Sequence, residues 1–186
     1  LVAHGAPRRI VRAASRAMRD EMRHVRQTSA LARRFGESPL APPPPPPRAA
    51  RSLEELATEN AVEGCVRETY SALECLCQAE SAADPVVRAT MKRVARDEMR
   101  HLALAWSVHS WARGKLSPPA RHRLLAAQRQ AVTELRAEVA EDPHRSLTSE
   151  GGLPTGRQSQ ALIASIESRL PGRGSKGAPG GAPLWS

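Results

Sequence analysis

Aromatic side chains are scarce in this chain of 186 residues, which contains three Trp, one Tyr and one Phe. RNA-binding modules that stack bases on a sheet need several exposed rings, so the scarcity argues against this class. An all-β sandwich is disfavoured as well, because strands prefer aromatic and β-branched residues. No segment approaches the ~20 apolar residues of a membrane span. These absences predict a soluble, helix-rich protein.

Cysteine is also rare, and its spacing forms no metal or disulfide motif. The chain has Cys65, Cys75 and Cys77, and no pair has the C-x-x-C spacing of a zinc knuckle. Two helical residues that are two positions apart point about 200° away from each other, so Cys75 and Cys77 cannot easily form a bridge. We therefore expect small buried side chains in a reducing, cytoplasmic compartment.

Lysine is nearly absent, although the chain is basic. It has 28 Lys+Arg against 19 Asp+Glu, a formal net charge of +9, and only three of the basic residues are Lys. The excess is +8 in residues 1–52, −3 in residues 53–113 and +4 in residues 114–186. A basic surface can attract nucleic acid. A solvated Arg-rich surface is the preferred interpretation, and we do not expect nucleic-acid binding.

Proline and glycine divide the chain. Residues 36–52 include the six consecutive prolines Pro42 to Pro47, which predict a stiff polyproline II segment. Residues 171–186 are rich in Gly and Pro and predict a disordered tail. The remainder has helical periodicity. The expected helices cover residues 8–35, 53–82, 85–114, about 118–142 and about 155–170, with N-caps at Ser52, Asp84 and Ser117.

A six-residue motif occurs twice in the predicted helices. Residues 19–24, Arg-Asp-Glu-Met-Arg-His, recur as residues 96–101. Each copy contains Glu-x-x-His, as Glu21 with His24 and Glu98 with His101. Residues three apart on a helix project from one face, so two facing helices bring two carboxylates and two imidazoles to one place. Because hard carboxylate oxygens mixed with imidazole suit iron or manganese, the repeat predicts a metal site.

The residues beside these ligands have a predicted supporting role. A ligand His donates its other ring N–H to a carboxylate that fixes its orientation. Asp20 and Asp97 precede the two glutamates and are expected to meet the imidazole of the opposite helix. Arg23 and Arg100 are expected to hold those aspartates.

A dimetal site in a helical bundle also needs carboxylates from the remaining helices. In the helix 53–82, Glu63 shares an α-helical face with several apolar residues, whereas Glu68 lies about 140° away at 100° per residue. The depth along the hairpin favours Glu68 slightly, because it is closer to the level of Glu98 and His101. We predict Glu63 as the ligand and keep Glu68 in reserve.

Other polar and aromatic residues have simpler predicted roles. Tyr70 could be a redox tyrosine near the metals, but a packed core position is the preferred interpretation. His109 is expected to be an ordinary polar residue at the end of the bundle. Trp106 and Trp111 are expected to be packing anchors.

The paired D-E-x-R-H motif resembles that of the ferritin-like superfamily of di-iron carboxylate proteins, and residues 63–69 resemble the third helix of uncharacterised ferritin-like domain proteins of bacteria. The resemblance implies an all-α, ferritin-like four-helix bundle over residues 1–113, with residues 36–52 as the long crossover. Residues 114–170 would form a C-terminal extension of one or two helices. In the family order, a carboxylate helix precedes the first E-x-x-H. We therefore expect the sequence to be truncated, lacking most of its first helix.

The resemblance also implies a function. Two iron ions, or manganese, would be held by Glu21, His24, Glu63, Glu98 and His101 and would react with O₂ or peroxide as in an oxidoreductase. The substrate stays open. The alternative is a degenerate or truncated bundle without metal that acts as an interaction module, with its Arg-rich first helix on an acidic partner. An exposed apolar groove could then be filled by homodimerisation.

Overall fold

The computed structural model describes residues 1–39 and 51–170, and within these ranges the chain is all-helical, without a strand. Residues 40–50 of the predicted crossover 36–52 and the predicted tail from 171 to 186 lie outside the described residues. No helix in the described part is long and apolar enough to cross a membrane. The elements are η1 (Val2–His4), α1 (Arg8–Arg34), α2 (Leu53–Glu59), η2 (Asn60–Arg67), α3 (Glu68–Ser81), α4 (Pro85–Lys115), α5 (Pro118–Glu138), α6 (Arg145–Ser149) and α7 (Gly156–Glu167).

The helix starts predicted from N-cap residues are confirmed. The Ser52 hydroxyl accepts a hydrogen bond from the backbone N–H of Glu55, whose side chain accepts one from the Ser52 N–H, forming a capping box. Asp84 accepts from the backbone N–H groups of the second and third residues of α4, and Pro85 occupies the first position. The sequence did not predict two short elements, the 3₁₀ turn η1 and the five-residue α6, which is too short to show helical periodicity. The helix predicted to end near residue 142 ends at Glu138.

The middle of the predicted helix 53–82 is a π-helix. Residues 60–67 form η2, so the chain runs continuously as α2, η2 and α3 with a change in winding. η2 lies against α4: the Asn60 amide donates to the carbonyl oxygen of Ala105 at 3.0 Å, and a methyl group on Gly64 would lie 2.8 Å from the Ala105 Cβ. A uniform 100° per residue therefore does not apply to this segment.

Two apolar clusters hold the helices together. One joins Val66 and Tyr70 to residues of α5 and α7, including Leu135 and Ile163. The other joins alanines of α2 and η2 to Ala112 of α4 and Leu124 of α5. The predicted extension, residues 114–170, thus shares both clusters with the preceding helices. Trp106 packs against the first cluster and Trp111 against the second, as expected of packing anchors.

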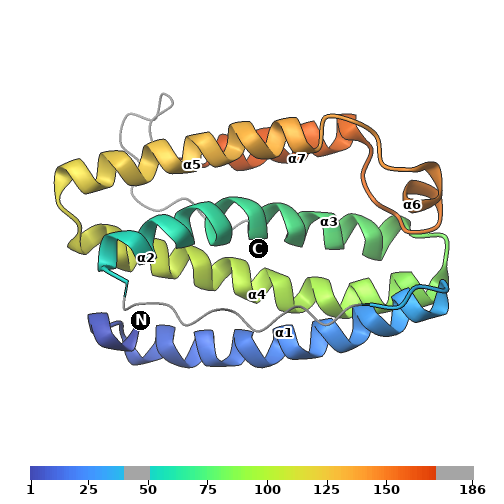
Figure 1. The fold of residues 1–186 in the computed structure, drawn as a ribbon, viewed down its shortest axis with the longest axis horizontal. Helices are drawn as coiled ribbons and strands as arrows, with labels where there is room; N and C mark the ends of the chain where they lie inside the picture. Colours follow the sequence, from blue (N-terminus) through green and yellow to red (C-terminus); the bar gives the residue numbers. More distant parts are fainter. Residues whose placement is uncertain (40–50, 171–186) are drawn as a thin grey trace.

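The helices are arranged in layers (Figure 1). α5 and α7 cover one side of the α2–η2–α3 rod, α4 runs along its other side, and α1 packs on α4 at the opposite edge from α5. The two copies of the repeated motif lie on α1 and α4. The remaining predicted carboxylates, Glu63 and Glu68, lie on η2 and α3.

Candidate metal centre

The two Glu-x-x-His motifs meet across α1 and α4. His24 is 7% and His101 3% exposed in its side chain, and their ring centroids are 5.7 Å apart. The Nδ1 atom of His24 lies 3.0 Å from Oε1 of Glu98, and the Nδ1 atom of His101 lies 2.9 Å from Oε1 of Glu21. Each imidazole therefore faces the glutamate of the opposite motif.

Each imidazole is held from behind by the aspartate of the opposite helix. The His24 Nε2 atom lies 3.1 Å from Oδ2 of Asp97, and the His101 Nε2 atom lies 3.4 Å from Oδ2 of Asp20. The carboxylate is the acceptor in each pair, so Nε2 carries the proton. Both contacts are those expected from the sequence, and they fix which nitrogen points inward.

The two arginines of the motifs tie these aspartates together. Arg23 donates to Asp20 at 2.8 Å and also to Asp97. Arg100 donates to Asp97 at 2.5 Å and to Asp20 at 3.3 Å. Burial by itself would raise the pKa of Asp97, but hydrogen bonds from Arg23, His24 and Arg100 outweigh it and lower the pKa to about 2. Both aspartates remain ionised acceptors at neutral pH.

A third carboxylate joins this group from α3, and it belongs to Glu68. Glu21, Glu68, Glu98 and His101 each offer one ligand atom, and these atoms all lie within 4.8 Å of one another. Glu98 is buried, whereas Glu21 and Glu68 are partly open to solvent. The structure thus brings together a compact set of carboxylate oxygens and imidazole nitrogen.

Glu63, the first choice from helical phase, does not belong to this four-residue group. Glu63 is exposed and lies one π-turn before Glu68. It lines the two surface clefts that lead to this group, which are described below. Glu63 as a ligand stays a prediction, whereas the described geometry brings Glu68 to the group. The phase argument assumed α-helical geometry, but η2 inserts a π-turn between the two residues, and the depth along the hairpin agrees with the position of Glu68.

The group carries more negative charge than the arginines and imidazoles beside it neutralise. Burial, followed by the negative charge of Glu98, raises the pKa of Glu68 to about 7. Burial opposes protonation of His101, but the Glu98, Asp20 and Glu21 carboxylates outweigh it and raise its pKa to about 9. The contacts of both Nδ1 atoms have ion-pair distances without hydrogen-bond geometry, so the two buried nitrogens have no hydrogen-bond partner.

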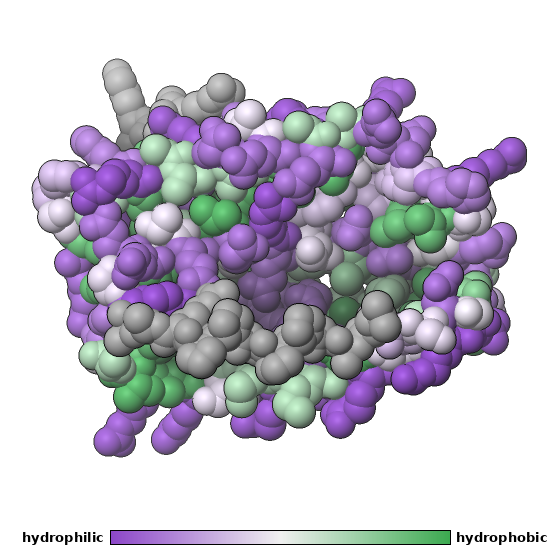
Figure 2. All heavy atoms as spheres, viewed as in Figure 1, coloured by the Kyte–Doolittle hydropathy of each residue, from purple (hydrophilic) through white to green (hydrophobic). Residues whose placement is uncertain are grey.

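Two clefts give access to the group. One of about 520 Å³ is lined by Glu21, Glu63, Glu68 and Glu98 together with Cys75 of α3. The other, about 350 Å³, reaches His101 from the side of α2 and η2. Figure 2 shows the hollow that separates α1 from the α2–η2–α3 rod on this face of the molecule. A small molecule can therefore approach the carboxylates from solvent.

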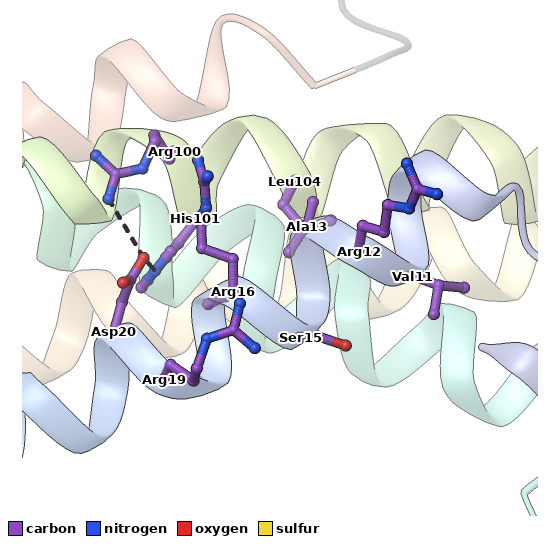
Figure 3. A pocket seen from close by; sticks show the side chains of 11 residues that line it. Val11, Arg12, Ala13, Ser15, Arg16, Arg19, Asp20, Arg100, His101 and Leu104 are labelled. Atoms are coloured by element: carbon purple, nitrogen blue, oxygen red, sulfur yellow. Dashed lines mark hydrogen bonds and ion pairs between the residues drawn. The ribbon is translucent and has the colours of Figure 1, made fainter.

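A different pocket, about 640 Å³, lies on the outer side of His101 between α1 and α4. Arg12, Arg16, Arg19 and Arg100 line it, and Figure 3 shows the Arg16 side chain extending from α1 towards α4 beside His101. Arg100 forms an ion pair with Asp20. Within the described residues, Arg12, Arg16 and Arg19 form no ion pair. This pocket is strongly basic, in contrast to the acidic clefts.

Comparison with known proteins identifies a family. The family model described as steroid receptor RNA activator (SRA1) matches residues 34–151, which is more than half of the chain. The chain belongs to the SRA1 family. No curated protein and no solved structure matches it.

The SRA1 match covers only part of the candidate metal centre. It begins at the last residue of α1, so Glu21, His24 and Asp20 precede the matched residues, while Glu68, Glu98 and His101 lie within them. These comparisons do not point to the ferritin-like superfamily that the repeated motif resembles. The SRA1 match therefore gives no support for or against metal binding by this group.

Proposed function

We propose that this chain is a dimetal-carboxylate protein, with the ferritin-like bundle architecture that its repeated motif resembles. Glu21, Glu98, His24 and His101 would hold two iron ions, or manganese, and Glu68 would supply a further carboxylate. In this proposal, α1, α4 and the α2–η2–α3 rod would be three of the helices of such a bundle. The proposal uses Glu68 in the role first assigned to Glu63.

One observation carries the proposal. Each of the two motif glutamates lies close to both imidazoles. Oε1 of Glu21 is 2.9 Å from Nδ1 of His101 and 3.6 Å from Nδ1 of His24. Glu98 places Oε1 3.0 Å from Nδ1 of His24 and Oε2 3.4 Å from Nδ1 of His101. Two carboxylates shared between two imidazoles are suited to a pair of cations.

The protonation of the ring nitrogens fits metal binding. Because Asp97 and Asp20 accept from Nε2, each ring turns its Nδ1 atom towards carboxylate oxygens, and both Nδ1 atoms lack a hydrogen-bond partner. A lone pair facing an anion is unfavourable unless a proton or a cation lies between them. The mixed oxygen and imidazole set favours iron or manganese over zinc held by thiolates.

The chain's own residues would prepare and protect the centre. Asp20 and Asp97 hold the imidazoles, and the two arginines hold the aspartates, so the ligand positions are set before a metal arrives. A bound pair of such ions supplies redox chemistry towards O₂ or peroxide. The open cleft at Glu21 and Glu68 would admit these small molecules, and the protein would then act as an oxidoreductase.

Metal analysis tests the proposal. The purified chain, loaded anaerobically with Fe²⁺ or Mn²⁺ and freed of excess, should retain about two ions by elemental analysis. His24→Ala and His101→Ala should each lose metal, whereas His122→Ala on the exposed surface of α5 should keep it. Circular dichroism before loading separates loss of ligands from loss of fold. No retained iron or manganese in a folded wild-type chain would rule the proposal out.

The basic pocket of Figure 3 favours a second candidate function, an interaction module without metal. Arg12, Arg16 and Arg19 face solvent without acidic partners among the described residues. Met18, Met22 and Val25 on the same helix are more than half exposed. An acidic helical partner could dock on α1 through both features.

Charge-reversal variants test this second candidate. Polyglutamate should bind the wild-type chain with an affinity that falls as salt rises, and Arg12→Glu with Arg16→Glu should abolish binding. Arg129→Glu on α5 is the matched control because it is also exposed but far along the chain from α1. Equal binding by all three proteins would contradict docking on α1.

A further inference from the structure

A separate polar pocket lies between the C-terminal part of α4 and the first half of α5. Its volume is about 300 Å³, and its polar lining residues are His109, Arg113, Arg121, His122 and Gln128. His109 is eight residues beyond His101 on α4, a rise of about 12 Å along the helix. None of the candidate metal ligands lines this pocket, so it is a different site.

Gln128 is the anomaly in this pocket. Its side chain is 0% exposed, and neither Nε2 nor Oε1 has a hydrogen-bond partner. It occupies the buried face of α5 between Leu124 and Val132, where an apolar residue would be expected. Nearly all buried polar groups in native proteins are paired, so a buried amide with both ends unpaired points to a partner outside the chain.

His109 presents a second unpaired group in the same pocket. Sequence reasoning expected an ordinary polar residue at the end of the bundle, but the ring is 5% exposed and its Nδ1 has no hydrogen-bond partner. Burial, followed by the positive charge of Arg113, lowers the pKa of His109 to about 4. The ring is therefore neutral at physiological pH and offers a polar atom without adding charge.

Two guanidinium groups make the pocket positive. Arg121 donates from Nε to the carbonyl oxygen of Arg113 at 2.9 Å, a contact that leaves its terminal nitrogens free for another acceptor. Within the part of the chain that the structure describes, neither arginine forms an ion pair with a carboxylate. The pocket thus combines two unneutralised cations with a buried amide that needs one acceptor and one donor.

We propose that this pocket binds a small oxyanion that also carries a hydroxyl group, namely free hydrogen phosphate. The anionic oxygens would accept from Arg113, Arg121 and the Gln128 Nε2–H₂ group. The hydroxyl would donate to Gln128 Oε1. Of the small dianions, sulfate supplies the acceptors but has no donor, so it would leave Oε1 unpaired.

The test compares hydrogen phosphate with sulfate at slightly alkaline pH, where both are dianions. The complete chain, without added metal, is titrated while the side-chain amide NMR signal of Gln128 is followed; its absence in Gln128→Leu identifies it. Phosphate should shift this signal saturably, and sulfate should bind roughly tenfold or more weakly. Arg113→Gln should weaken phosphate binding, whereas Arg129→Gln, an exposed residue of α5 that does not line the pocket, should leave it unchanged.

Thermal unfolding gives an independent readout. Phosphate should raise the melting temperature of the wild-type chain but not that of Gln128→Leu, which removes the unpaired amide and should fold at least as well. A Gln128 signal that does not respond to phosphate would overturn the proposal, since buried water alone would then account for the pairing. Equal affinity for sulfate and phosphate would overturn the role assigned to Gln128.

Discussion

The backbone N–H of Glu68 donates to the carbonyl oxygen of Glu63, five residues earlier in the chain. This i→i−5 bond replaces the i→i−4 bond of an α-helix, and the wider turn reduces the ~140° that would separate the two side chains in α-helical geometry. Glu68 therefore joins Glu98 and His101 while Glu63 lies at the rim of the cleft. One turn of π-helix thus accompanies the placement of Glu68, rather than Glu63, beside Glu98 and His101.

The first prediction separates these two glutamates. Glu68→Gln should weaken Fe²⁺ or Mn²⁺ binding by more than roughly 100-fold, because losing a ligand costs more than losing a ligand's hydrogen-bond partner, which costs roughly 10–100-fold. Glu63→Gln should change the metal affinity little. Isothermal titration calorimetry under anaerobic conditions measures both. A larger loss in Glu63→Gln would show that the side chains exchange roles when metal binds.

The second prediction concerns the aspartates behind the imidazoles. Asp97→Asn should reduce metal affinity roughly 10–100-fold, because Nε2 of His24 loses its anionic acceptor and the ring is no longer fixed. Asp20→Asn should act in the same way through His101. Glu80→Gln, an exposed carboxylate of α3, is the control. Metal affinity equal to that of the wild type in both Asn variants would contradict this role.

The third prediction tests the close approach of η2 to α4. Gly64→Ala should destabilise the chain by about 1–3 kcal/mol, because the new methyl group would lie 2.8 Å from the Cβ of Ala105. Gly114→Ala near the end of α4 has open space and should stabilise the chain by up to about 1 kcal/mol. Urea unfolding compares them. Equal effects would mean that α4 can move away from η2 without cost.

The fourth prediction concerns Tyr70, which packs in the larger apolar cluster and donates to the Ser159 hydroxyl at 2.8 Å. Tyr70→Phe should cost about 1 kcal/mol of unfolding free energy by leaving Ser159 without its buried partner. Metal content and oxidation of bound iron by O₂ should remain unchanged. Altered oxidation kinetics would instead support the redox role considered from the sequence.

The fifth prediction is a pH dependence due to His109. Its pKa in the folded chain is lowered to about 4, mainly by burial, from an ordinary value of 6.5. Below pH ~6.5 the unfolded chain binds a proton that the folded chain does not, so stability falls as pH decreases towards ~4. His109→Leu should remove on the order of 3 kcal/mol of this decrease, measured by urea unfolding across the range. Parallel stability profiles for the two proteins would refute it.

Much of the helical framework could be predicted because its signals are local. The capping box at Ser52 and the Asp84–Pro85 start depend on residues a few positions apart, and the structure has both. The reciprocal contacts between the two motifs were also predictable, since a repeated six-residue segment on two facing helices presents the same groups to each other.

The sequence by itself determined that the chain is helical, where its main helices begin, and that two Glu-x-x-His motifs carry matching aspartates and arginines. Only the tertiary structure decided that Glu68 stands beside them and that Gln128 and His109 are buried without partners. The position of Glu68 depends on the π-turn of η2, which contacts α4 at Ala105. The burial of Gln128 and His109 depends on which helices pack over them. Neither is encoded in the periodicity of a single helix.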